Sequence, residues 1–240
     1  MTPDESRLAD LCATFAEELH ATLAGVLPGA PRIVSRKYEI GDRYVVRPDG
    51  ATAREQRIAL FVGGERVAWL SVSLYLDLDR DRTYLKTVRS DIAVTSELDD
   101  TPLLRVEYAA DMRRDPIAHW QVHAERGAFS YLLTRAHLHR PRRVPKPHDL
   151  SSVHLPVGGE RFRPCVEDVL HLLVQDFGVD PLEGWEQVLA AGRERWRRRQ
   201  VASAARDVPE VAARVLGDLG YTVTPPAEPR PVNRAALQAW

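Results

Sequence analysis

The stretch RVAWLSVSLYLDL, residues 66–78, alternates apolar and polar side chains along most of its length. A period of two residues is typical of a strand with one face against a core, because successive side chains point to opposite faces. Aromatic and β-branched residues, which favour strands, are frequent in it. We therefore expect this stretch to form a half-buried strand.

The same period extends from residue 31 to about residue 126. The expected strands are Arg32–Val46, Arg57–Val62, Arg66–Leu78, Tyr84–Val94, Leu103–Ala109 and Ala118–Glu125. Gly63-Gly64 predicts a hairpin turn, because glycine adopts positive φ without steric cost. The acidic segments at 79–81 and 98–100 are interpreted as turns of the meander, since the DLDRD spacing lacks the glycine and glutamate of a calcium loop. The pattern predicts an antiparallel meander of about five or six strands.

Helical periodicity flanks the meander. Residues 4–27 place apolar side chains three and four positions apart, which predicts an amphipathic helix against one face of the sheet. A first C-terminal helix is expected over Val166–Phe177, and a second from Leu182 to about Arg206.

A third C-terminal helix is expected to be capped by Asp207. Its inner face would carry Val211, Val215 and Leu219. The tail that follows combines a proline-rich spacer with a short segment ending at Trp240, which would dock on a partner or on its own domain.

These patterns together predict an α+β fold. Four segments are expected: helix plus sheet (1–126), a basic proline-rich connection with the histidine cluster (127–164), a helical subdomain (165–223) and a proline-rich tail (224–240). The chain is 44% hydrophobic with net charge −1, as expected of a globular protein with a core. Arginine outnumbers lysine thirty to three, which indicates a bacterial origin from a GC-rich genome.

The expected compartment follows from three features of the sequence. It has two distant cysteines, an acidic N-terminal stretch and no apolar run of membrane-spanning length. We expect a cytoplasmic protein with no contact to a membrane.

Histidines concentrate in one region. Six of the eight lie at His119, His123, His137, His139, His148 and His154. Imidazole titrates near neutral pH and is the commonest metal ligand, so this region is the first candidate for chemistry.

The segment AHWQVHAE, residues 118–125, predicts a strand with His119, Gln121, His123 and Glu125 on one face. Four residues along a strand span about 13 Å, too far for two ligands of one ion. This face is either the solvated side of the sheet or a reaction face suited to phosphodiester cleavage.

His137 and His139 form an HxH pair within a possible short strand over Arg135–Arg140. In an extended chain both would point the same way, but a bare HxH is a weak metal signal. We expect no metal and no cofactor, and assign the pair, with His119, His123 and Glu125, to the candidate catalytic set.

Two basic stretches accompany these features. Arg140, Arg142, Arg143 and Lys146 would hold phosphate or nucleic acid, since arginine donors match phosphate oxygens. A second basic run surrounds Trp196 and predicts either a solvated helix face or a contact surface for an acidic partner or for phosphate. The candidate partner-binding residues are Arg195, Trp196, Arg198 and Arg199 of this run, and Trp240 of the tail.

Cys165 is expected at the start of a helix, where a thiol pKa is lowered, which suggests a nucleophile. The alternative is a small residue that starts the helix.

Two functions remain. The first is a non-catalytic interaction or adaptor subunit of a bacterial cytoplasmic complex, bound to another protein subunit and in contact with RNA or DNA. The second is a small nuclease or phosphodiesterase of the toxin or defence type that uses the histidine-rich basic face. The absence of any specific catalytic spacing favours the adaptor.

Overall fold

The structure is a computed structural model, and it describes residues 3–38, 43–98, 100–113, 115–123, 134, 137–138, 142, 146, 155–157 and 161–239. The strands are β1 (Ile33–Lys37), β2 (Tyr44–Pro48), β3 (Ile58–Val62), β4 (Glu65–Leu78), β5 (Leu85–Ser96), β6 (Pro102–Ala109), β7 (Ala118–Val122) and β8 (Leu155–Pro156). The helices are α1 (Pro3–Val26), α3 (Val166–Gln175), α4 (Trp185–Asp207), α5 (Pro209–Asp218) and α6 (Arg234–Gln238). This order confirms the expected α+β class.

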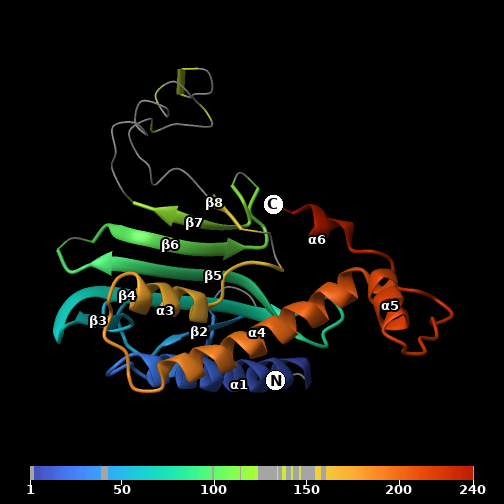
Figure 1. The fold of residues 1–240 in the computed structure, drawn as a ribbon, viewed down its shortest axis with the longest axis horizontal. Coiled ribbons are helices and arrows are strands. Elements are labelled where there is room, and N and C mark those ends of the chain that lie inside the picture. Colours follow the sequence, from blue (N-terminus) through green and yellow to red (C-terminus); the bar gives the residue numbers. More distant parts are fainter. Residues whose placement is uncertain are drawn as a thin grey trace.

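The strands form one antiparallel sheet around the long strand β4 (Figure 1). The order is β1-β2-β4-β5-β6-β7-β8, and β3 also pairs with β4. The C-terminal half of β4 pairs with β2, starting at Leu76 opposite Tyr44. Its N-terminal half pairs with β3, ending at Glu65 opposite Val62. One edge of β4 therefore serves two short strands placed end to end.

The single strand predicted over Arg32–Val46 is wrong. The structure has a hairpin there, because β1 and β2 pair antiparallel and the backbone N–H of Tyr38 donates to Arg43 O at 2.8 Å. The residues between them include Gly41-Asp42, a turn-forming pair in the sequence.

The Gly63-Gly64 hairpin turn between β3 and β4 is confirmed. Both glycines have positive φ, 61° and 81°. The carboxylate of Asp180 accepts hydrogen bonds from the backbone N–H groups of Gly63 at 3.0 Å and Gly64 at 2.7 Å. The loop after α3 is thereby tied to the tip of the hairpin.

A hydrophobic core joins α1, α3 and α4 to one face of the sheet (Figure 1). Leu23, Leu70, Leu170 and Leu189 are among its most buried members, one from α1, one from β4, one from α3 and one from α4. The opposite face of β4 carries Ser71, Ser73 and Asp77 together with Trp69 and Tyr75. No described helix is long and apolar enough to cross a membrane.

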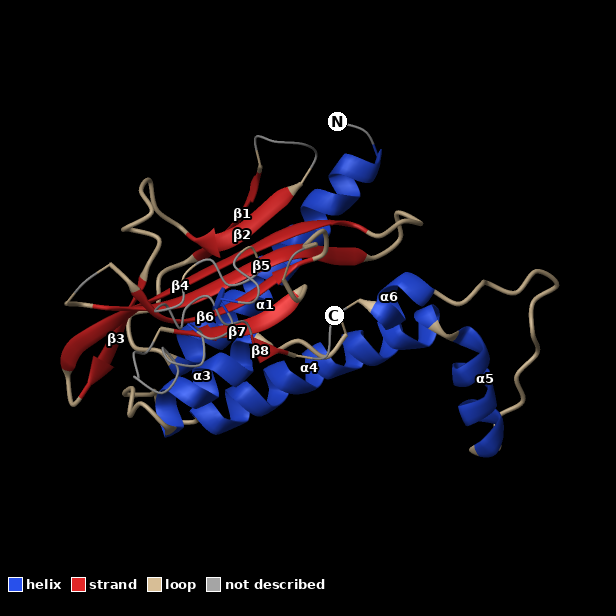
Figure 2. Ribbon diagram, turned by 90° about the horizontal axis from the view of Figure 1, so that it is seen from above, coloured by secondary structure: helices blue, strands red, loops and turns tan. Residues whose placement is uncertain are grey.

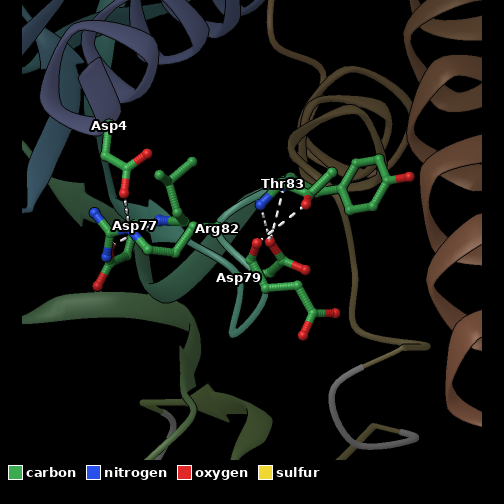
Figure 3. A network of polar contacts seen from close by, with 8 residues as sticks. Asp4, Asp77, Asp79, Arg82 and Thr83 are labelled. Atoms are coloured by element: carbon green, nitrogen blue, oxygen red, sulfur yellow. Dashed lines mark hydrogen bonds and ion pairs between the residues drawn. The ribbon is translucent and has the colours of Figure 1, made fainter. Parts of the chain in front are cut away.

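The acidic β4–β5 connection is a hydrogen-bonded turn, as predicted (Figure 3). Asp79 Oδ1 accepts from the backbone N–H groups of Thr83 at 2.6 Å and Tyr84 at 2.8 Å. Arg82, which has a φ of 54°, pairs with Asp4 of α1. The turn thus binds the start of α1.

The helix α5 departs from prediction in two respects. Its N-cap is Val208, because α4 continues through Asp207, so Asp207 is not the cap. Its expected inner face is exposed, with none of its residues buried. Figure 2 shows α5 at the far end of α4, away from the sheet.

Candidate functional site

The first histidine of the cluster lies in a polar row that crosses the sheet. In the antiparallel register His119 is opposite Glu107, Glu107 is opposite Asp91, and Asp91 is opposite Ser73. Directly opposed residues share a face, so these side chains line the same side of β4 to β7. Val106, next to Glu107 in sequence, belongs to the core on the other side.

His119 is fully buried, with 0% of its surface exposed. Its Nε2 lies 3.3 Å from Glu107 Oε2, and its Nδ1 lies 2.8 Å from Pro116 O. Both ring nitrogens therefore have neighbours that accept hydrogen bonds, which favours the protonated ring.

The pKa values in this row follow from these contacts. Burial alone lowers the pKa of His119, but the Glu107 carboxylate and the Pro116 carbonyl outweigh it and raise that pKa above 6.5. The contact with His119 holds the pKa of Glu107 below its usual value, against the effect of burial. Burial raises the pKa of Asp91 despite the neighbouring Arg89. The row is an ion pair between the buried His119 and the half-buried Glu107, with the carboxyl group of Asp91 beside it.

The interpretation of this strand face as solvated is wrong for two of its residues. His119 and Gln121 are both buried, whereas His123 is half-buried beyond the end of β7, where its backbone N–H donates to Leu103 O at 2.9 Å. The strand itself is as predicted, so a helical HxxxH zinc site at His119 and His123 is excluded.

The remaining candidates of the histidine region are only partly described. His137 and Leu138 are helical, so the short strand predicted there is wrong at these positions. Arg142 and Lys146 are exposed. The candidates Glu125, His139, Arg140, Arg143 and Trp240 lie outside the described residues. Within the described part of the chain, no three His, Cys, Asp or Glu side chains are placed to hold a metal ion.

The arginines of α4 contact their own chain. Arg198 pairs with Glu194 at 2.7 Å, one turn earlier on the same helix. Arg199 pairs with Glu18 of α1 at 2.7 Å. The first contact lies on the helix's own surface, and the second joins α4 to α1.

Trp196 faces inward, toward the segment before α3. The guanidinium of Arg163 lies between two rings, 4.9 Å from the centroid of Trp196 and 4.1 Å from that of Tyr108. Arg195 reaches the hydroxyl of Thr22 at 3.5 Å, at the long limit of a hydrogen bond. Trp196 is therefore part of the protein's own packing.

Cys165 precedes α3, as predicted, but its environment counts against a nucleophile. The thiol is buried and donates to Asp168 Oδ2 at 3.2 Å. Burial and the acidic neighbours Glu167 and Asp168 raise its pKa, which disfavours the reactive thiolate.

A cleft between α1 and α4 was not predicted. It is lined by side chains of α1, β4, β5, the segment before α3, the first turn of α3, and α4. No local pattern indicates such a site, because its walls come from segments more than 170 residues apart in the sequence.

The described part of the tail contacts its own chain. Asn233 donates through its backbone N–H to Asp207 O at 2.8 Å and through Nδ2 to Asp207 Oδ1 at 2.9 Å. Arg230 pairs with Asp81 of the β4–β5 turn at 2.6 Å. Arg161 also pairs with Asp207 at 2.6 Å. Asp207, which was expected to cap α5, is the last residue of α4. It joins the tail, through Asn233, to the segment before α3, through Arg161.

No protein family, no curated protein and no solved structure matches this chain. Its function must therefore be argued from its own residues.

Proposed function

We propose that this protein is a non-catalytic adaptor subunit of a bacterial cytoplasmic complex, and that it contacts another protein through the apolar face of α5. The observation that carries the proposal is that α5 buries none of its residues, although its sequence is amphipathic. Its exposed apolar side chains are Val211, Val215 and Leu216, followed just after the helix by Leu219, Tyr221 and Val223.

The energetics support a contact surface. Leu219 is 69% exposed and Val215 is 48% exposed, so water covers side chains that a partner would desolvate. Burying one such side chain contributes about 1.5–3 kcal/mol. A helix of ten residues is also marginal by itself in water. A partner with an apolar groove would therefore stabilise α5 as well as bind it.

The nuclease alternative gains no support from His119. A general base must reach the proton that it removes, whereas the His119 ring is fully buried and pairs with Glu107. Contact with nucleic acid remains part of the proposal through the exposed Arg142 and Lys146.

The test is purification of the tagged protein from its native cells, with mass photometry and analysis of the same fraction for nucleic acid and metal. We expect a stable complex with one protein in fixed stoichiometry. The double variant Val215→Asp/Leu219→Asp should lose that protein, because a charge on the apolar face cannot be desolvated cheaply.

The matched control is Gly217→Asp. Gly217 lies on α5 with open space around its Cβ position, so a single aspartate charge is introduced there without a clash. This variant should keep the partner. A complex that survives Val215→Asp/Leu219→Asp would remove α5 as the contact surface.

A further inference from the structure

One face of the sheet is not packed against the helices of the core. The helices α1, α3 and α4 join the core on the other face (Figure 1). On this open face β4 carries Trp69, Ser71, Ser73 and Tyr75, each of which is partly exposed. Trp69 and Tyr75 lie about 20 Å apart along the strand. The open face of β4 therefore presents two aromatic rings with hydroxyl groups between them.

Arginine side chains lie over both rings. The guanidinium of Arg66 is 4.6 Å from the centroid of the Trp69 ring, and that of Arg89 is 5.7 Å from the centroid of Tyr75. Tyr38 meets Tyr75 edge to face, with 5.2 Å between the ring centroids. The side chains of Arg66 and Arg89 are still 43% and 58% exposed. Nucleobases stack on aromatic rings and on guanidinium planes, so each end of the row offers a stacking surface.

The arginines over the two rings are neutralised by carboxylates. Arg66 pairs with Glu97, and Arg89 pairs with Asp91 at 2.7 Å. They offer planes for stacking but little net positive charge. A ligand of this row would therefore be held mainly by stacking and only in small part by charge.

Arg47 of β2 supplies a positive charge beside the row. It lies on the same face as Val45, two residues earlier, and Val45 is opposite Tyr75 in the sheet. Among the described residues no carboxylate is within ion-pair distance of Arg47, whereas Arg36 on β1 pairs with Asp49 at 2.6 Å. Guanidinium N–H groups match phosphate oxygens, so Arg47 is placed to hold one phosphate near the Tyr75 ring.

We propose that this open face binds single-stranded nucleic acid, with one base stacked at Trp69, another at Tyr75 and a phosphate on Arg47. A duplex is the poorer occupant, because its bases are stacked on one another and their faces are not free. The proposed adaptor contacts nucleic acid through Arg142 and Lys146. The open face is a different surface and depends neither on those residues nor on α5.

The test uses the whole protein and a fluorescein-labelled DNA strand of mixed sequence, about 12 nucleotides long, alone and annealed to its complement. Fluorescence anisotropy measures both affinities over a range of salt concentrations. The single strand should bind more tightly than the duplex. The logarithm of its affinity should fall with the logarithm of the salt concentration with a slope of about −0.7, as expected for one phosphate contact.

Three variants locate the site. Trp69→Leu and Tyr75→Leu keep an apolar side chain but remove the ring, and each should weaken single-strand binding about fivefold or more. Arg47→Gln should weaken binding and bring the salt slope close to zero. The matched controls are Tyr221→Leu and Arg197→Gln, because both residues are exposed and lie in the tail and on α4. They should leave binding unchanged.

Urea unfolding of each variant is measured alongside. If Trp69→Leu or Tyr75→Leu does not fold, Arg47→Gln and ultraviolet cross-linking of a bromouracil-substituted strand to the wild-type protein decide the result. Mass spectrometry should place the cross-links on β4.

The double variant Arg142→Gln/Lys146→Gln separates the two nucleic-acid surfaces and should leave single-strand binding unchanged. Loss of binding in this variant with no loss in Trp69→Leu and Tyr75→Leu would move the contact to Arg142 and Lys146 and overturn the proposal. Equal affinity for duplex and single strand, cross-links that avoid β4, or no binding at low salt would each overturn it as well.

Discussion

The helices α3 and α5 have the same length and a similar amphipathic pattern, but α3 is packed in the core and α5 is exposed. Both α3 and α5 have ten residues. The helix α3 buries Val166, Val169, Leu170 and Leu173 against the sheet and α4, whereas α5 buries none of its residues. An amphipathic sequence therefore predicts a helix with an apolar face, but not whether that face is covered within its own chain.

The largest expected difference between the two helices is in stability. Leu170→Ala should lower the free energy of unfolding by about 2–5 kcal/mol, because it leaves a cavity in the core. Leu219→Ala should change it by no more than about 0.5 kcal/mol, since the side chain is exposed. Urea unfolding of both variants measures this. Similar costs for the two would mean that α5 is packed in the isolated protein.

Charged pairs can be compared in the same way, according to whether their members are buried or exposed. His119 and Glu107 form the pair with a fully buried member. His119→Gln should destabilise the protein by about 1–3 kcal/mol, because it removes the charged ring from a fully buried position beside the half-buried Glu107 carboxylate. The raised pKa of His119 means that its contribution is complete below pH 6.5 and lost as the pH rises through the folded pKa. The lowered pKa of Glu107 means that its contribution is complete above pH 4.5 and lost as the pH falls through the folded pKa.

The pair should therefore contribute most between pH 4.5 and 6.5. Chemical unfolding of wild type and His119→Gln across pH 4–9 tests the sign. A difference between them that grows from pH 6.5 to pH 9 would contradict the ion pair.

The smallest effect is expected at the exposed pair. Arg198→Ala should lower stability by no more than about 0.5 kcal/mol, since Arg198 and Glu194 are both largely exposed on α4. Differential scanning calorimetry at low and high salt checks this. A loss above about 1 kcal/mol would show that the basic run of α4 has a structural role beyond its contacts.

The helices and strands with a clear hydrophobic period were predictable from the sequence. The elements against which they pair or pack were not. The strands β3 to β7 and the helix α1 follow directly from alternation and from spacings of three and four. The hairpin at β1 and β2 was missed because the apolar alternation of the sequence continues on both sides of residues 39–42. Local pattern does not determine where a strand folds back.

The candidate site depends even more on long-range contacts. The sequence singled out His119 and placed it on a polar strand face, but its pairing with Glu107 depends on the register of β6 and β7. Likewise, Asp207 has the residue type of a helix cap and is used instead to join Arg161 and Asn233.

The proposed role of α5 is tested most directly by amide hydrogen exchange of α3 and α5, in the isolated protein and in the complex purified from native cells. In the isolated protein, amides of α5 should exchange far faster than those of α3, because few contacts oppose its local opening. In the complex, α5 should become protected while α3 stays unchanged. Protection of α5 equal to that of α3 in the isolated protein, or no change of α5 in the complex, would contradict its role as the contact surface.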